Sequence, residues 1–189
     1  MSQALEIRGL SHSYPPRTVL EDIEFSVPAG RTVALVGPSG CGKTTLLHLC
    51  AGLLSVQKGA LGNPFECPAV MFQQPRLLPW KTTQDNIALG LQALGVPVVE
   101  RLDRAKALAE AVGLDALALG QFPHELSGGM QSRAALARAL VLAPDLLLMD
   151  EPFSALDIGL KQQLHRLLLE HQAAHGLTVL MITHDLMEA

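Results

Sequence analysis

The chain has 189 residues, 49% of them hydrophobic and 17% charged, a balance that allows a folded core and excludes intrinsic disorder. Its formal net charge of −4 and its 4% content of aromatic residues exclude a protein that binds nucleic acid through bulk positive charge or base stacking. No apolar run reaches the roughly 18–20 residues of a membrane-spanning helix.

Two kinds of apolar pattern predict two kinds of strand. Apolar and polar residues alternate at positions 5–8 and 23–27, which predicts antiparallel strands with one buried face. Continuous apolar runs further along predict buried parallel strands. These runs cover residues 32–36, 69–72, 146–149 and 178–182.

Helical spacing of apolar residues predicts helices between these strands. One follows Lys43, and the others cover residues 99–112, 128–142 and 158–174. Residues 82–142 carry almost no strand signal, so we expect them to form a helical subdomain inserted into an α/β core. The predicted architecture is a mainly parallel core sheet with an N-terminal antiparallel β subdomain and this helical insertion.

A phosphate-binding loop is predicted between the strand at residues 32–36 and the following helix, where the sequence matches G-x-x-x-x-G-K-[ST]. Glycines let backbone N–H groups approach phosphate oxygens at a helix N-terminus. The Lys43 ammonium would bind the β- and γ-phosphates, and the Thr44 hydroxyl would ligate Mg²⁺. A plain glycine turn is the alternative. The loop consists of Gly37, Pro38, Ser39, Gly40, Cys41, Gly42, Lys43 and Thr44.

Two carboxylates follow the apolar run at residues 146–149. A buried strand would deliver Asp150 to the carboxyl edge of the sheet, where it suits a ligand of Mg²⁺ or of its water. Glu151 points elsewhere and could act as the general base for an attacking water. Alone, the pair could be a solvated turn, but beside a phosphate loop it indicates nucleotide hydrolysis.

A serine and two glycines precede the helix predicted at residues 128–142. Ser127 can cap that helix, and the amides of Gly128 and Gly129 could bind a second phosphate. One small domain has little use for two anion sites on one nucleotide. Two facing chains would use both, so the sequence suggests a dimer with nucleotide between the chains.

Together, these motifs resemble the nucleotide-binding cassette of ABC transporters, which uses ATP and Mg²⁺. The resemblance implies a P-loop NTPase fold over residues 1–189, with the ATP-binding core at 1–73 and 143–189 and a helical signature subdomain at 74–142. Met130 stands where the family most often has glutamine. The motifs occur in the family's order, at residues 37–44, 126–131, 148–151, 154–157 and 183–185.

The resemblance also implies roles in nucleotide binding and hydrolysis. Tyr14 would stack on adenine, and Thr45 would contact the α-phosphate. His184 would contact the γ-phosphate and orient the water or Glu151. Gln73 would ligate Mg²⁺ and sense the membrane partner, with Gln74 as the second candidate.

Further implied contacts lie across the interface of two cassettes. Asp157 matches the aspartate of a loop that crosses this interface. The signature segment, residues 126–131, would bind the nucleotide of the partner cassette, and the expected partner is a second copy of the chain. The signature contacts would come from Ser127, Gly128, Gly129 and Gln131.

Residues 73–80 form a proline-rich stretch whose apolar side chains need a covering partner. In the family, permease subunits dock near here. The sequence PRLLPW is similar to import ATPases of the nitrate, sulfonate and taurine group. This resemblance implies a peripheral protein at the cytoplasmic face of the inner membrane, working with a permease and a periplasmic or surface solute-binding protein.

Two departures from the family pattern concern length. The stretch from Lys43 to Gln73 is short, so we expect part of the antiparallel subdomain to be trimmed. The sequence ends at Ala189, shortly after His184, so we expect a truncated C-terminal part and exposed apolar surface around residues 178–182.

Two alternatives to a transport ATPase stay open on the sequence alone. One is an ABC-type ATPase that is not coupled to transport, although neither a long coiled-coil insertion nor a second cassette is present. The other is a truncated nucleotide-binding module without full turnover.

Overall fold

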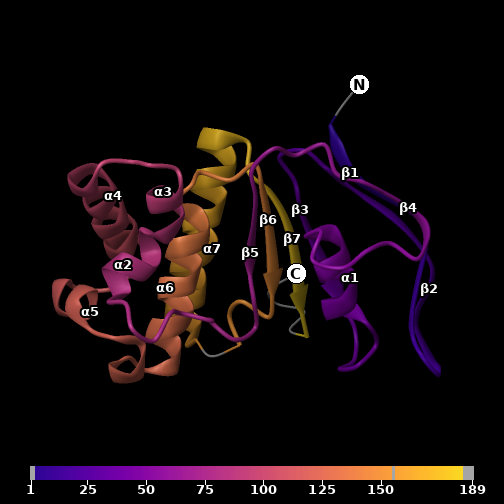
Figure 1. The fold of residues 1–189 in the computed structure, drawn as a ribbon, viewed down its shortest axis with the longest axis horizontal. Coiled ribbons are helices and arrows are strands. Elements are labelled where there is room, and N and C mark those ends of the chain that lie inside the picture. The colour runs from indigo at the N-terminus through magenta and orange to yellow at the C-terminus, as the bar shows by residue number, and fades with distance from the viewer. Residues whose placement is uncertain (1–2, 155, 185–189) are drawn as a thin grey trace. The chain divides into compact units, whose positions relative to one another are not determined.

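The structure is a computed structural model that describes residues 3–154 and 156–184 (Figure 1). The chain forms two compact units. The first consists of Met1–Val70, Asp145–Glu151 and Gln172–Ala189, and the second of Met71–Pro144 and Pro152–His171. The helical subdomain expected at residues 74–142 lies within the second unit, which also takes in part of the stretch assigned to the ATP-binding core.

The first unit contains the predicted antiparallel sheet. Strands β1 (Ala4–Tyr14), β2 (Arg17–Pro28) and β4 (Lys58–Gly62) pair in the order β2-β1-β4. Leu5 and Ile7 of β1 are buried, while the intervening Glu6 is partly exposed, as the alternating pattern predicts. Strands β1 and β2 extend well beyond residues 5–8 and 23–27, where the alternation is regular. A shift in their pairing register between Ile7 and Leu10 turns Leu10 back toward the core, where it is buried.

Strand β4 was not predicted, because its sequence KGALG carries little strand propensity. It forms by pairing with β1, which supplies the hydrogen-bonding edge. Gly59 has a φ of +87° and lies against the backbone of Arg8 and Gly9, so close approach explains the glycine. The shortened stretch therefore still contributes a third strand to the sheet.

Replacing Gly59 with alanine is expected to lower the free energy of unfolding by roughly 2–4 kcal/mol, because the new Cβ adds a clash to an unfavourable backbone conformation. That Cβ would lie 2.6 Å from the Arg8 carbonyl oxygen. Gly52→Ala is the matched control, since Gly52 has a φ of +70° with open space around it, and should cost only about 1 kcal/mol. Urea unfolding of both variants measures the difference, and equal costs would contradict the packing argument.

The second sheet carries the elements that end in functional motifs. Strands β3 (Thr32–Val36), β7 (Thr178–Thr183), β6 (Leu146–Asp150) and β5 (Pro68–Met71) form it in the order β3-β7-β6-β5. The β3–β7 and β7–β6 pairs are parallel. These are the four strands predicted from the continuous apolar runs. Parallel register brings the carboxyl ends of β3, β6 and β7 to one edge of the sheet.

The expectation of exposed apolar surface around residues 178–182 is wrong. Strand β7 lies between β3 and β6, and none of the residues of β7 is more than 3% exposed. Since both edges of β7 are paired, the strand is an interior strand of the sheet even though it is the last strand among the described residues.

Helix α1 (Lys43–Cys50) lies between the two sheets of the first unit (Figure 1). Its leucines join one hydrophobic core with β1, β6 and β7. The helix ends at Cys50, and Gly52 turns the chain with its N–H donating to the Leu49 carbonyl. Burial raises the pKa of the Cys50 thiol to about 12.

The second unit is built of helices, as the sequence predicts, and residues 82–142 contain no strand. Its main helices are α4 and α6, and α2 packs against both of them. Polar side chains cap α2, α5 and α6, because Thr82, Asp115 and Ser127 each accept a backbone N–H. The helices are α2 (Thr83–Ile87), α3 (Leu89–Ala93), α4 (Val98–Ala111), α5 (Ala116–Gly120), η1 (Pro123–Glu125), α6 (Gly128–Leu140) and most of α7 (Ile158–His175).

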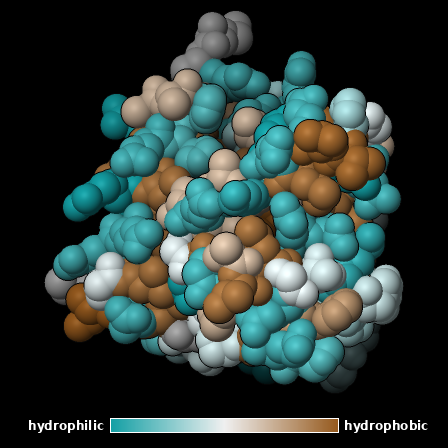
Figure 2. Space-filling view, turned by 90° about the vertical axis from the view of Figure 1, so that its left-hand side faces the viewer, coloured by the Kyte–Doolittle hydropathy of each residue, from teal (hydrophilic) through white to brown (hydrophobic). Residues whose placement is uncertain are grey.

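Hydrophobic residues reach the surface of the helical unit in separate patches between hydrophilic ones (Figure 2). Leu94, Val98 and Val99 are exposed around the turn from α3 to α4. Within the described ranges, no helix combines the length and the apolar character needed to cross a membrane.

Candidate functional site

The phosphate loop joins β3 to α1 at the carboxyl edge of the parallel sheet. Two of its glycines adopt left-handed backbone angles, with φ of +79° at Gly40 and +98° at Gly42. A Cβ at Gly42 would lie 2.8 Å from the Val19 carbonyl oxygen and from a methyl group of Leu20. Gly42 is therefore required both by its backbone angle and by the packing of α1 against β2.

Lys43 is the first residue of α1, and its side chain bends back over the loop. The Nζ atom donates to the carbonyl oxygens of Gly37, at 2.7 Å, and Pro38, at 2.8 Å. It also lies 3.7 Å from the Cys41 sulfur. These contacts hold the ammonium at the loop, where the sequence pattern places a phosphate-binding charge.

Cys41 is exposed in this loop, whereas Cys50 is buried in α1 and its raised pKa keeps its thiol protonated near neutral pH. N-ethylmaleimide is therefore expected to modify Cys41 and to spare Cys50, since the thiolate is the reactive form. Saturating MgATP should slow the modification of Cys41 several-fold. Half-buried Cys67 lies outside the loop and is the control, whose rate should not change. Peptide mass spectrometry measures all three rates, and unprotected Cys41 would contradict a nucleotide at the loop.

The structure brings the phosphate loop and the predicted metal-ligand strand together. The Thr44 hydroxyl donates to Asp150 Oδ2 at 2.7 Å, although the two residues are 106 positions apart in the sequence. Asp150 ends β6 and is 4% exposed. Among the described residues, no three His, Cys, Asp or Glu side chains form a metal site by themselves. The Thr44 hydroxyl oxygen and the Asp150 carboxylate are suitable ligands for Mg²⁺, which usually combines one or two protein ligands with phosphates and water.

Glu151 and His184 also meet at this edge. The Glu151 N–H donates to the Ile182 carbonyl at 2.9 Å, which ties it to β7, and its φ of +48° is uncommon for a residue other than glycine. Its Oε1 lies 3.6 Å from His184 Nδ1. The Glu151 side chain is 19% exposed and that of His184 is 63% exposed. A shielded carboxylate beside an accessible imidazole suits proton transfer. Asp185, the last residue of the predicted motif, lies outside the described residues.

Two further predicted contacts belong to the same unit. Tyr14 ends β1, is 47% exposed and packs edge-to-face on His12, with 4.9 Å between ring centroids. Its exposed fraction leaves ring surface for an adenine, and this role stays a prediction. Thr45 follows Thr44 in the first turn of α1, and its α-phosphate contact also stays a prediction.

The signature segment lies in the second unit, and its residues have different local roles. Ser127 Oγ accepts the Met130 N–H at 3.3 Å, and both Ser127 and Gly128 are exposed at the start of α6. Gln131 instead donates to the carbonyl oxygens of Pro123, at 2.9 Å, and Leu126, at 3.3 Å. Gln131 therefore supports the segment, which leaves Ser127 and the glycine amides as the groups open to a ligand.

The remaining predicted residues of the second unit are Gln73, Gln74 and Asp157. Both glutamines are exposed after β5. Asp157 Oδ1 accepts the Leu160 N–H at 3.0 Å and thereby supports the start of α7. Ala155 of the same motif lies outside the described residues. The first unit thus brings Lys43, Thr44, Asp150, Glu151 and His184 to one edge, and the second presents the glutamine and signature segments.

Sequence reasoning missed Asn86, which is fully buried in α2. Its Oδ1 accepts the Leu78 N–H at 2.7 Å, and its Nδ2 lies within 3.1 Å of the carbonyl oxygens of Leu78, Lys81 and Thr82. The available signal was an asparagine inside a helical stretch, where this residue is unfavourable unless its amide has a specific partner.

A comparison with protein families identifies the group to which this site belongs. The family described as ABC transporter matches residues 20–154, which include the phosphate loop and the Asp150–Glu151 pair. The chain belongs to the ABC transporter family. It is 44% identical to the taurine import ATP-binding protein TauB of Escherichia coli O157:H7, over 98% of this chain and 75% of that protein. The Shigella sonnei protein of the same name is 43% identical over the same shares.

Solved structures of ABC transporter cassettes share this fold. The dimeric structure of the bacterial ABC transporter cassette MJ0796 matches with a TM-score of 0.90 and 27% identity, over 98% of this chain and 90% of that one. A post-hydrolysis dimer of the same cassette bound to ADP and Pi matches with a TM-score of 0.88 over the same shares. The expected fold class is confirmed. The chain is an ATP-hydrolysing cassette of a transport system, as its sequence motifs predicted.

Proposed function

We propose that this cassette energises an importer of taurine, another sulfonate, nitrate or a similar small solute. The observation that carries the proposal is the meeting of Thr44 with Asp150 and of Glu151 with His184 at one sheet edge. The 44% identity to a taurine import ATP-binding protein supports the substrate group, and so does the PRLLPW sequence after Gln74.

In this proposal, the first unit carries the chemistry of hydrolysis. Lys43 and the loop N–H groups bind the β- and γ-phosphates, and Thr44 and Asp150 hold Mg²⁺, which neutralises charge on the phosphates when it is bound. Glu151 accepts a proton from the attacking water. His184, 3.6 Å from that carboxylate, contacts the γ-phosphate and orients the base.

We further propose that two copies of the chain close over two ATP molecules. Ser127 and Gly128 are exposed at a helix N-terminus, a suitable place for the phosphates of the partner's nucleotide. Asp157 would lie at the same interface. The dimeric structures of the related cassette support this arrangement.

The proposed membrane partner docks on the glutamine loop, residues 73–80. Trp80 is 70% exposed there, which is unusual for so large an apolar side chain and suits a surface that a partner covers. Permease subunits bound at this loop would hold the cassette at the cytoplasmic face of the inner membrane, and a solute-binding protein outside would deliver the substrate.

Reconstitution tests the proposal. The cassette is co-expressed with the permease and the solute-binding protein of its transport system, and uptake of labelled taurine, other sulfonates and nitrate is measured together with ATP hydrolysis. We expect uptake of one of these solutes and ATPase activity that rises with it. Full ATPase activity without any permease would favour an uncoupled ATPase, and ATP binding without turnover in the complete assembly would favour a non-catalytic module.

A further inference from the structure

The glutamine loop is held from one side by a charged residue of α6. Arg138 donates through Nη2 to the Pro75 carbonyl oxygen at 2.7 Å and through Nη1 to the Arg76 carbonyl oxygen at 2.8 Å. The guanidinium is partly buried, and this burial lowers its pKa, yet arginine keeps its charge in proteins. A charged donor with two carbonyl acceptors forms stronger hydrogen bonds than a neutral one, so this contact should hold the loop firmly.

The backbone of the loop is shaped to present both carbonyls to that guanidinium. Arg76 has a φ of +46°, an uncommon angle for a residue with a side chain, and needs surrounding contacts to keep it. Its own guanidinium carbon lies 4.8 Å from the centre of the Phe72 ring. The Arg76 side chain thus contacts Phe72 at the start of the loop, while Arg138 holds the backbone of Pro75 and Arg76.

The other end of the glutamine loop is held by α2. Buried Asn86 bonds Leu78, Lys81 and Thr82, and α2 packs directly against α6. Trp80 lies between two residues that Asn86 bonds, Leu78 and Lys81, and its side chain stays exposed. The loop is therefore joined to the helices at both ends while the Trp80 side chain remains accessible.

Helix α6 also begins at the signature segment. Ser127 caps its first turn, and Arg138 lies in its last turn, about 16 Å further along the helix axis at roughly 1.5 Å per residue. A continuous helix is stiff over this distance. A displacement of the loop should therefore move Ser127, and a displacement of Ser127 should move the loop.

We propose that Arg138 is a positioning residue that fixes the glutamine loop to the signature helix and so couples the two. The hydrogen bonds of Arg138 go to the carbonyls of Pro75 and Arg76. Arg138 belongs neither to the signature segment nor to the phosphate loop, so it acts through the glutamine loop. The attachment of the loop by Arg138 can be measured on the chain alone. Its role in coupling transport to ATP hydrolysis rests on the proposed function.

The first experiment measures the attachment in the purified chain. Hydrogen exchange is followed for the amides of residues 74–82, together with the fluorescence anisotropy of Trp80, the single tryptophan. We expect R138M to accelerate exchange in the loop at least about fivefold and to lower the anisotropy, since local opening loses its charged contact. R138K retains one charged donor and should give intermediate values.

Arg104 provides a matched control. Its Nη2 donates to the Val141 carbonyl at 3.0 Å, so R104M also removes a guanidinium–carbonyl contact to the end of α6 without touching the loop. R104M should leave loop exchange as in the unmodified chain. Equal loop exchange in R138M and R104M would overturn the proposed attachment.

The second experiment measures coupling in the complete transporter with taurine as the probe. We expect R138M to keep basal ATPase activity within about twofold and to reduce the taurine-stimulated increment at least about fivefold. R138K should recover part of the increment, and R104M should keep the increment of the unmodified transporter. A normal stimulation ratio in R138M would overturn the coupling role. Absence of taurine stimulation in the unmodified transporter would instead contradict the proposed substrate, and loop exchange would still decide the attachment.

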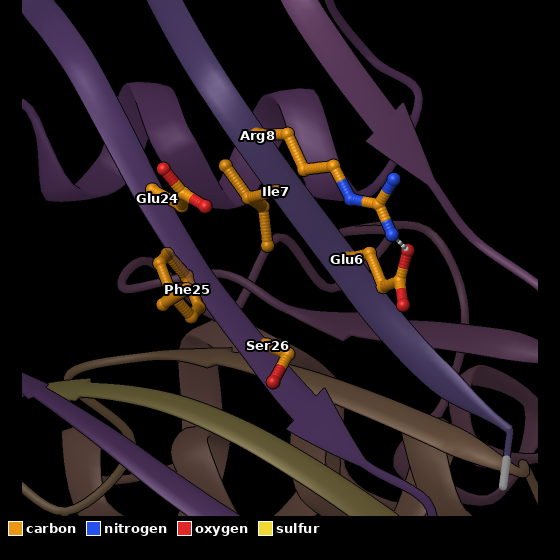
Figure 3. Close-up of a pocket in the computed structure, with 6 residues that line it drawn as sticks. All are labelled: Glu6, Ile7, Arg8, Glu24, Phe25 and Ser26. Carbon is orange, nitrogen blue, oxygen red and sulfur yellow. Dashed lines mark hydrogen bonds and ion pairs between the residues drawn. The ribbon is translucent and has the colours of Figure 1, made fainter.

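A shallow hollow of about 190 Å³ on the face of β1 and β2 supports no comparable inference (Figure 3). Its charged residues include Glu6 and Arg8, which pair with each other at 2.5 Å, and no phosphate-loop residue lines it.

Discussion

Replacing Glu151 with glutamine is expected to lower the kcat for ATP hydrolysis by roughly 10²–10⁴-fold while leaving ATP affinity within about twofold. Glutamine preserves the shape of the side chain and the backbone bond to Ile182, but it cannot accept a proton from water. Phosphate release measures the rate, and titration with a fluorescent ATP analogue measures affinity. In the proposed dimer, this variant should also remain associated when ATP is present, which size-exclusion chromatography would detect.

Glu66→Gln is a suitable control for this variant. Glu66 is an exposed residue of the same unit. Its replacement by glutamine removes the same negative charge at a position outside the phosphate loop. Its turnover should match that of the unmodified chain. Normal hydrolysis by Glu151→Gln would show that another group activates the water, and a large loss of ATP affinity would assign Glu151 to binding.

Lys43→Ala is expected to weaken ATP binding about a hundredfold or more and to reduce turnover beyond detection. The substitution removes the positive charge that the phosphates would contact, and charge-assisted bonds to phosphate are among the strongest polar contacts in proteins. It also removes the Nζ bonds to Gly37 and Pro38 that help to shape the loop. Equilibrium binding of a fluorescent ATP analogue measures the effect.

The matched control is Lys58→Ala, which removes an exposed lysine at the start of β4 in the same unit. Its ATP affinity should stay within about twofold of that of the unmodified chain, apart from a small loss of long-range attraction. If Lys43→Ala bound ATP as well as Lys58→Ala does, the phosphate loop would not be the nucleotide site.

Much of the site could be predicted because its chemistry is local in the sequence. The glycines, Lys43 and Thr44 occupy one loop, and Asp150 and Glu151 follow one apolar strand. Because parallel strands place their carboxyl ends at one edge, motifs far apart in sequence are expected to meet there. The 2.7 Å contact of Thr44 with Asp150 is the outcome of that rule.

Other features depend on pairing and packing between distant segments. Strand β4 has no strand signal of its own and forms because β1 offers an edge. Burial of β7 follows from its position between β3 and β6, which its place near the end of the sequence did not indicate. Arg138 and Asn86 gain their roles from carbonyl groups of the glutamine loop, and backbone carbonyls leave no trace in a side-chain pattern.

The sequence by itself determined the ABC transporter family, the fold class and the types of residue at the nucleotide site, because phosphate and Mg²⁺ chemistry requires particular residues at short spacings. Only the tertiary structure decided that His184 lies 3.6 Å from Glu151, that Gln131 supports its own segment and that Arg138 holds the glutamine loop. These contacts join residues through space, and their distances depend on how strands and helices pack.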